Sequence, residues 1–187
     1  VFGLALLVLL ALRFTETLRQ PTPLQFGPLM RNWGRIASHR GFIAWAGLLA
    51  AAYGGLFTFL AASSFVFLDV YRVSRPMYGL AMASASLAYI LGTFACRRLL
   101  PRVGLQGAVR VGAALSLAGG TGIGLLAMAG VHTWWAFLLP HYLFMIGHGI
   151  HQPCTQTGAV APFPHIAGAA SALSGFFLTV VAFGIGA

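Results

Sequence analysis

The residues VGAALSLAGGTGIGLLAM, at positions 111–128, begin the stretch that decides the fold. From there to position 187 the chain holds no Asp, Glu, Lys or Arg. A helix needs about 20 consecutive apolar residues to cross the hydrocarbon core of a bilayer, and it satisfies its backbone polar groups internally. The stretch has room for three such crossings in succession. The sequence therefore predicts an all-α polytopic membrane protein.

The composition of the whole chain supports this class. Apolar residues make up 59% of it and charged residues 7%, against about 45–50% and 25% in a typical soluble domain. A net charge of +9 would suggest nucleic-acid binding in a soluble protein. Here all eleven cations are Arg, most of them between apolar runs, where cations orient membrane proteins and reach lipid headgroups. We expect contact with the lipid bilayer and no nucleic-acid binding.

The apolar runs predict five full spans after a partial first one. They cover residues 42–64, 77–96, 111–131, 134–151 and 166–187. Residues 1–12 are too short to span alone, and we interpret them as the end of a truncated transmembrane helix. Residues 13–40 are predicted to form a basic cytoplasmic central loop. Residues 41–187 are predicted to form a transmembrane bundle of five helices, with the last helix of the half missing.

Charge asymmetry predicts how these spans are oriented. Nine Arg lie in 13–40 and 97–110, whereas Arg72 and Arg75 alone lie in the alternate loops. Cationic loops stay on the cytoplasmic side, so both basic segments should face the cytoplasm. Within the central loop, apolar residues recur at helical spacing from Leu29 to Ala37. They indicate either a short helix on the inner membrane surface or an irregular basic linker.

Small residues at four-residue spacing predict where helices pack closely, because they allow backbones to approach. These stripes are Gly47, Ala51 and Gly55; Gly120 and Gly124; Gly168 and Ala172; and Ser171 and Gly175. Cys96 and Cys154 both fall at predicted cytoplasmic ends, where a reducing compartment disfavours a disulfide. We expect two free thiols, with Cys154 a candidate for a cavity mouth.

Few residues could carry enzymatic chemistry. Glu16 and Asp69 are the only acidic residues, and both lie at predicted membrane edges. We expect no enzymatic activity, no cofactor and no metal site. His141, His148 and His151 cluster in one span, and intramembrane ionisable groups are candidate functional groups. They could bind haem or a metal, relay protons, or line a polar cavity, although Pro153 is expected to break the helix before Cys154.

Aromatic residues gather on two predicted spans. Tyr53 and Phe57 lie on the first full span, and Phe176 lies on the last. Pockets for drug-sized molecules are mainly apolar and aromatic, with a few polar groups that fix orientation. Ordinary packing or lipid contact explains any one of these rings, so only the set suggests a pocket.

The order of motifs resembles the second half of the Bcr/CflA-type drug-resistance transporters of the major facilitator superfamily. The most specific block is Gly147, Gly149 and Pro153, then Phe163, Pro164, Ala167, Gly168, Ala170, Ser171, Ala172, Leu173 and Gly175. The Glu16-Thr17-Leu18 triplet, the segment from Ala62 to Val66, the Tyr71, Ser74, Tyr78 and Gly79 set, and the basic turn with Arg97 and Gly104 also match. Ser64 replaces the family's Pro, Arg72 replaces a Gly, and Cys154 replaces an Asn.

The resemblance implies the C-terminal half of a major facilitator-type bundle, from part of helix six through helix eleven. It also implies proton-driven export of small amphipathic drugs or antibiotics across a bacterial inner membrane by alternating access. The missing N-terminal half would hold the proton-coupling carboxylate, and the fragment alone should be inactive. The alternatives are a metabolite exporter on the same fold and a membrane haem or redox subunit built on the three histidines.

Two sets of site residues follow from the resemblance. The helices that line the family's cavity place the substrate near Tyr53, Phe57, Ser63, Tyr89, His141, His148 and Phe176. The basic turn assigns Arg97, Arg98 and Arg102 to a cytoplasmic gate region.

Overall fold

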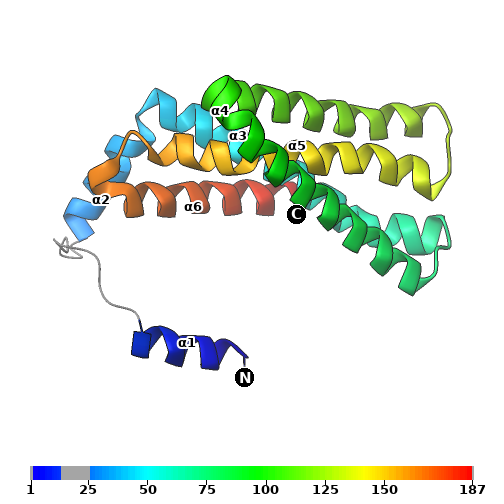
Figure 1. The fold of residues 1–187 in the computed structure, drawn as a ribbon, viewed down its shortest axis with the longest axis horizontal. Helices are drawn as coiled ribbons and strands as arrows, with labels where there is room; N and C mark the ends of the chain where they lie inside the picture. The colour runs from blue at the N-terminus through cyan, green and yellow to red at the C-terminus, as the bar shows by residue number, and fades with distance from the viewer. Residues whose placement is uncertain (1, 14–25, 187) are drawn as a thin grey trace.

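The computed structural model describes residues 2–13 and 26–186, and every regular element among them is helical. In chain order these are α1 (Phe2–Arg13), α2 (Phe26–Ala37), α3 (Arg40–Ser64), η1 (Phe65–Val70), α4 (Arg75–Met128), α5 (Trp134–Val160), η2 (Pro164–Ile166) and α6 (Ala167–Gly186) (Figure 1). The predicted all-α fold is confirmed. The Glu16-Thr17-Leu18 triplet lies outside the described residues.

Three helical segments of the described chain are long and apolar enough to cross a membrane. They are Arg40–Val70, Arg75–Met128 and Pro164–Gly184. The 54 residues of α4 correspond to about 80 Å of helix, enough for two crossings of a core about 30 Å thick. The 27 residues of α5 are also long enough for a crossing, but this helix carries three buried histidines.

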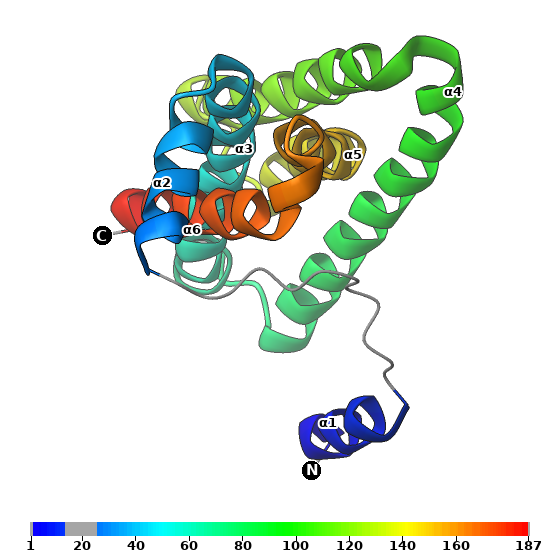
Figure 2. The same ribbon diagram turned by 90° about the vertical axis from the view of Figure 1, so that its left-hand side faces the viewer.

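A single residue divides α4 into two limbs. Gly104 has φ 68° and ψ −179°, a conformation that side chains with a Cβ rarely adopt. We call residues 75–103 the first limb and residues 105–128 the second limb; Figure 2 shows the sharp change of direction between them. The prediction of a loop over 97–110 is therefore wrong. The chain reverses at Gly104, so the basic residues on either side remain helical.

Helix α5 lies at the centre of the bundle. It contacts α3, α4 and α6, and Figure 2 shows it enclosed by them. The expectation that Pro153 would break this helix is wrong, because α5 continues to Val160. Proline removes one helix hydrogen bond, at the carbonyl of Gly149, but packing on both sides of a helix can hold it together across that gap.

Glycines bring the backbones of α4 and α5 into contact. A Cβ added at Gly112 would lie 2.8 Å from both the carbonyl oxygen of Gly147 and the amide nitrogen of His151. A Cβ at Gly149 would overlap the carbonyl oxygen of Tyr89 on the first limb. Both limbs therefore touch α5 through main-chain atoms.

The predicted stripes of small residues are mostly not at these contacts. A Cβ at Gly47, Gly120, Gly124, Gly168 or Gly175 would meet nothing within 4 Å. Among the glycines of these stripes, Gly55 is the one at which an added Cβ would meet a neighbour, the ring of Phe144 on α5. Four-residue spacing identifies a smooth helix face, but it does not tell which neighbouring helix, if any, covers that face.

The basic segment before α3 contains a helix, so it is not the irregular linker that the sequence also allowed. In α2, Ile36 is fully buried and Trp33 is partly buried against residues of α3, α5 and α6. Arg31 and Arg35 are exposed on the same helix. Helix α2 thus packs on the bundle through its apolar face, and Arg31 and Arg35 stay exposed.

The turn after η1 contains a strained residue. Arg72 has φ 53°, and it is the only described residue other than glycine with a positive φ. A left-handed conformation costs a residue with a Cβ about 1–2 kcal/mol. This is the position at which the resembling family has glycine, so the substitution of Arg is accommodated with backbone strain.

Replacing Arg72 with glycine should therefore stabilise the protein. We expect Arg72→Gly to raise the free energy of unfolding by about 1 kcal/mol and Arg72→Ala to leave it near the parent value. Thermal unfolding of the detergent-purified protein measures both. Equal behaviour of the two variants would contradict the assignment of strain to this residue.

Substituting Gly112 should disturb the contact between α4 and α5. We expect Gly112→Ala to lower the free energy of unfolding by about 1–3 kcal/mol, because the added methyl group forces two backbones apart. Gly124→Ala is the matched control on the same limb, since a Cβ there meets open space. It should leave the melting temperature unchanged or raise it. The same loss in both variants would show that the helix contact is not the cause.

Candidate functional site

Helix α5 supplies most of the buried polar side chains of the described bundle. His141, His148 and His151 are 2%, 2% and 1% exposed. The turn of about 100° per residue places His141 and His148 on one side of α5, about 10 Å apart along its axis. The three imidazoles therefore occupy two separate environments.

The first environment, which we call the polar cluster, consists of Tyr53, Tyr89, His148, His151 and Gln152. The Tyr89 hydroxyl donates to Oε1 of Gln152 at 3.0 Å, and Nε2 of Gln152 donates to the Tyr53 hydroxyl at 3.2 Å. One amide from α5 thus joins a tyrosine of α3 to a tyrosine of α4. All three of these side chains are half-buried, so the bridge borders the surface of the described bundle.

Aromatic rings surround His148 behind this bridge. Its ring centroid lies 5.1 Å from that of Tyr53, 5.9 Å from Tyr89, 6.0 Å from Phe144 and 5.3 Å from His151. His151 in turn lies 3.2 Å, through Nε2, from the hydroxyl of Ser116 on the second limb of α4. The polar cluster therefore draws on α3, the first limb of α4, and α5, and it contacts the second limb through Ser116.

Two imidazole nitrogens of the polar cluster have no hydrogen-bond partner within the described protein. They are the Nδ1 atoms of His148 and His151, and both are buried. Buried polar atoms almost always find a partner, from protein or from bound molecules. The cluster therefore has hydrogen-bonding capacity that its own side chains leave unused.

The second environment surrounds His141. Its ring stacks on Phe59 with a centroid distance of 3.3 Å and an interplanar angle of 4°. Together with Phe137 and Phe144 it lines a hollow of about 280 Å³ between α3, the second limb of α4, and α5. The remaining lining residues are Gly55, Thr58, Ala62, Gly120 and Ile123. This hollow is apolar and aromatic, unlike the polar cluster.

The structure thus separates the residues predicted to share one substrate cavity. Tyr53, Tyr89 and His148 lie together in the polar cluster, and His141 lies in the aromatic hollow. Ser63 is fully buried elsewhere, where its hydroxyl lies 2.9 Å from that of Tyr78.

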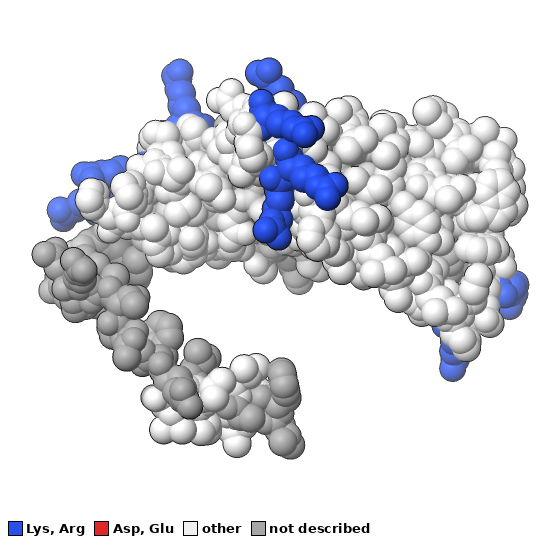
Figure 3. Space-filling model, in the orientation of Figure 1, with Lys and Arg blue, Asp and Glu red and all other residues white. Residues whose placement is uncertain are grey.

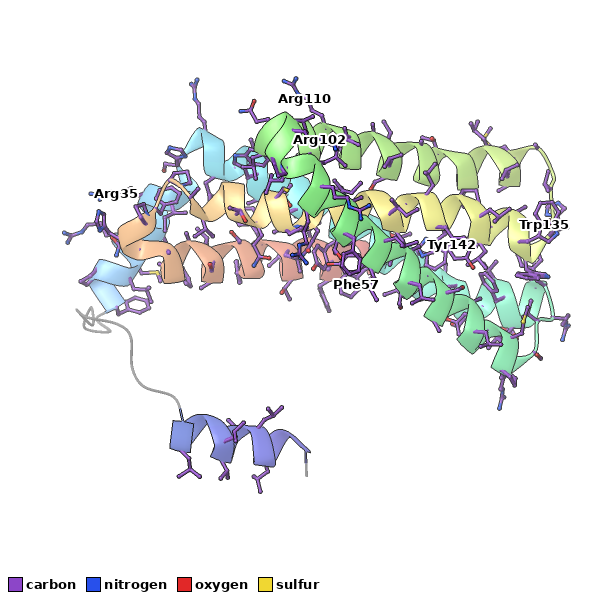
Figure 4. The ribbon with its side chains drawn as sticks, viewed as in Figure 1. Arg35, Phe57, Arg102, Arg110, Trp135 and Tyr142 are labelled. Carbon is purple, nitrogen blue, oxygen red and sulfur yellow. The ribbon has the colours of Figure 1, made fainter. Side chains whose placement is uncertain are left out.

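The two predicted phenylalanines are on the surface of the described bundle. Phe57 is 41% exposed beside Tyr53 (Figure 4). Phe176 on α6 is 59% exposed. Exposure does not distinguish a cavity wall from a lipid-facing surface, because both are apolar in a membrane protein.

Arg97, Arg98 and Arg102 are all exposed on the first limb of α4, just before its bend. Figure 4 shows Arg102 and Arg110 together at this bend, with Arg35 on α2 and Trp135 at the opposite end of the bundle. Figure 3 shows most Arg side chains of that view over the α4 bend and α2, and a few at the far end. Most of the Arg side chains in that view are thus separated, along the length of the bundle, from the few at the far end.

The histidines do not converge on one metal ion. Among the described residues, no group of three His, Cys, Asp or Glu side chains is placed to hold a metal. His148 and His151 are neighbours, but the ring of His141 is packed on Phe59. The suggested haem or redox site on all three histidines has no geometric support in this part of the chain.

Sequence reasoning missed two members of this network, Gln152 and Ser116. Gln152 follows His148 by four residues, which places both on one face of a helix. That spacing was an available signal, but the expected helix break at Pro153 obscured it. No sequence signal pairs Ser116 with His151, because the contact depends on how the two helices pack.

Comparison with known proteins shows which proteins this chain is similar to. No family model matches the chain. It is 30% identical over 178 residues to the uncharacterized MFS-type transporter YdgK of Bacillus subtilis (strain 168), an alignment that covers 94% of this chain and 44% of the relative. The chain is thus similar to part of a transporter of the major facilitator type. The predicted family resemblance is confirmed at that level.

A second relative is a bicyclomycin resistance protein homolog of Haemophilus influenzae. It is 23% identical over 171 residues, with 91% of this chain and 43% of that protein covered. The chain spans less than half the length of both relatives, which agrees with one half of such a transporter.

The hydrogen-bonded bridge can be tested by a double-mutant cycle. We expect Gln152→Leu to lower the free energy of unfolding by about 1–3 kcal/mol, because two hydrogen bonds are lost, and Tyr53→Phe by about 1 kcal/mol. The double variant should match Gln152→Leu alone, since its bond to Tyr53 is already absent. Thermal unfolding in detergent supplies the four values. Additive losses would mean that the amide does not bond Tyr53.

Proposed function

We propose that this chain forms the C-terminal half of a secondary active transporter that exports small amphipathic drugs or antibiotics in exchange for protons. The observation that carries the proposal is the polar cluster, a set of hydrogen-bonding side chains from three helices within apolar surroundings. The name of the second relative, a bicyclomycin resistance protein homolog, supports a drug as the substrate class.

The chemistry of the polar cluster suits amphipathic molecules. Aromatic rings of Tyr53, Tyr89 and Phe144 offer apolar contact, while hydroxyl, amide and imidazole groups offer hydrogen bonds. Binding sites for drug-sized molecules combine mostly apolar walls with a few polar groups that fix orientation. Because Tyr53, Tyr89 and Gln152 are half-buried, a molecule at their face could contact them directly.

We propose that transport needs two halves of a larger protein, of which this chain supplies one. In this architecture two helical halves rock about a site between them, which gives alternating access. Residues 13–40 would form the cytoplasmic connection between the halves, and residues 41–187 the C-terminal bundle. The separation of cations along the bundle supports a cytoplasmic position for α2 and the α4 bend, with Arg97, Arg98 and Arg102 at a gate region.

Proton coupling needs a group that exchanges protons during transport. Glu16 and Asp69 are the only acidic residues of the chain, and Asp69 lies in η1 next to the turn at Tyr71. We therefore place the coupling carboxylate in the N-terminal half. Under this proposal His141 and His148 contact the substrate and do not carry the coupled proton.

The proposal is tested in the complete transporter, expressed in an efflux-deficient bacterium. We expect lower accumulation of a dye and of chloramphenicol-like drugs, and reversal of that effect by a protonophore. Tyr89→Phe should raise the KM for export roughly 2–10-fold, because one hydrogen bond of about 1 kcal/mol is removed from the cluster. Tyr78→Phe is the matched control, since its hydroxyl bonds Ser63 outside the cluster.

Two outcomes would overturn parts of the proposal. Unchanged accumulation across a broad drug panel, with the protein present in the membrane, would favour export of a metabolite on the same fold. Equal effects of Tyr78→Phe and Tyr89→Phe would remove the polar cluster from substrate binding.

The position of the coupling group has its own test. We expect His141→Phe and His148→Phe to change the KM for export while export remains sensitive to a protonophore. Proton uptake by vesicles during drug transport measures the coupling directly. Loss of coupled proton movement with drug binding retained would place the coupling group in this half instead.

A further inference from the structure

Two buried thiols lie side by side between α4 and α5, away from the polar cluster's hydrogen bonds. Cys96 is on the first limb of α4 and Cys154 is on α5, 58 positions later in the chain. Their Sγ atoms are 3.4 Å apart, and the residues are only 6% and 3% exposed. The thiols are free, as expected, but Cys154 is not at a cavity mouth.

The surroundings of the pair are apolar. Ala108, Val109 and Ile150 form the buried shell with the two cysteines, and Trp45 and Leu105 pack against it. A disulfide is neutral and fits such a shell, whereas two thiolates around a monovalent cation would leave a buried negative charge. The environment therefore favours oxidative closure over capture of a monovalent metal ion.

Backbone packing keeps the two sulfurs near each other. Along α5 the contacts of Gly92 with Ile146, and of Gly112 with His151, both lie before Cys154, and along α4 the two glycines lie on either side of Cys96. The helices cannot separate there without breaking main-chain contact. Closure from 3.4 Å to a bond of about 2 Å needs the two sulfurs to approach by little more than 1 Å.

A hollow at the α4 bend lies beside the layer of side chains packed on the pair. It has a volume of about 530 Å³, and its lining includes Gly104, Gln106 and Gly158. Trp45 and Leu105 belong both to this lining and to the layer packed on the thiols. These two side chains therefore separate the hollow from Cys96 and Cys154.

We propose that Cys96 and Cys154 form an oxidisable dithiol site, which a small neutral oxidant entering at the Gly104 hollow closes into a disulfide. With hydrogen peroxide, one thiol sulfur attacks the peroxide to give a sulfenic acid and water. The second sulfur then displaces the hydroxyl group as a second water, so that two thiols and one peroxide yield one disulfide and two waters. The product ties the first limb of α4 to α5, and the inference does not depend on the proposed transport function.

The test uses the full chain purified in detergent. The protein is treated with hydrogen peroxide or diamide, unfolded in the presence of N-ethylmaleimide, and weighed by intact mass spectrometry. We expect a loss of two hydrogens with no maleimide adduct, against two adducts in the untreated protein. Dithiothreitol should restore both adducts, and the oxidised protein should remain a monomer on a non-reducing gel.

Matched variants make the outcome decisive. Cys96→Ser and Cys154→Ser should each keep one maleimide adduct after oxidation, because the remaining thiol has no neighbour. Gln106→Cys in the Cys96→Ser/Cys154→Ser background reports whether reagents reach the hollow, since Gln106 is exposed. If this cysteine reacts while the native pair keeps two adducts, the proposal is overturned. Disulfides only between molecules, or oxygen added to single sulfurs, would overturn it as well.

Discussion

The contact between the backbones of α4 and α5 is the constraint on which the rest of this structure depends. Lipid provides no hydrophobic drive between helices, so close van der Waals packing must hold them together. At Gly112 and Gly149 there is no room for a side chain, and both limbs of α4 press on α5 as a result. The positions of Tyr89, Ser116, Cys96 and the α5 side chains facing them all follow from this packing.

This packing also determines what the interior of the bundle can bind. Because α5 is central, its three histidines are buried and Gln152 is half-buried, so these groups need partners on neighbouring helices. Gln152 is hydrogen-bonded to two tyrosines, and His151 lies within hydrogen-bond distance of Ser116. His148, in contrast, is surrounded by aromatic rings. The part of α5 from His148 to Gln152 is therefore a hydrogen-bonding surface, while the neighbourhood of His141, earlier along the same helix, is an aromatic hollow. A single amphipathic molecule could use the first, and the second suits apolar groups.

The sequence predicts the class of fold well because the signal is carried by many residues. The charge-free run from 111 to 187 requires helices in lipid whatever their packing. The bend at Gly104 was not predictable in the same way, since one glycine conformation decides between a loop and two abutting helices. The continuation of α5 through Pro153 likewise depends on its neighbours and not on local propensity.

The candidate site was only partly predictable, for a related reason. Intramembrane polarity identified the histidines, but it could not show that His141 stacks on Phe59 while His148 joins Tyr53 and Tyr89. The side chains of Phe57 and Phe176 were grouped with them because aromatic residues on lipid-facing and cavity-facing surfaces look alike in sequence. Gln152, the residue that bridges three helices, carries no sequence signal stronger than its spacing from His148.

Photo-crosslinking of a drug analogue to the complete transporter tests the central claim most directly. A photoreactive analogue is bound in membranes, activated by light, and located by peptide mass spectrometry, with unlabelled drug as competitor. The account predicts competed labelling of Tyr53, Tyr89 or Gln152, at the face where three helices meet. Competed labelling confined to the aromatic hollow, to α6 near Phe176, or to the other half of the protein would contradict it.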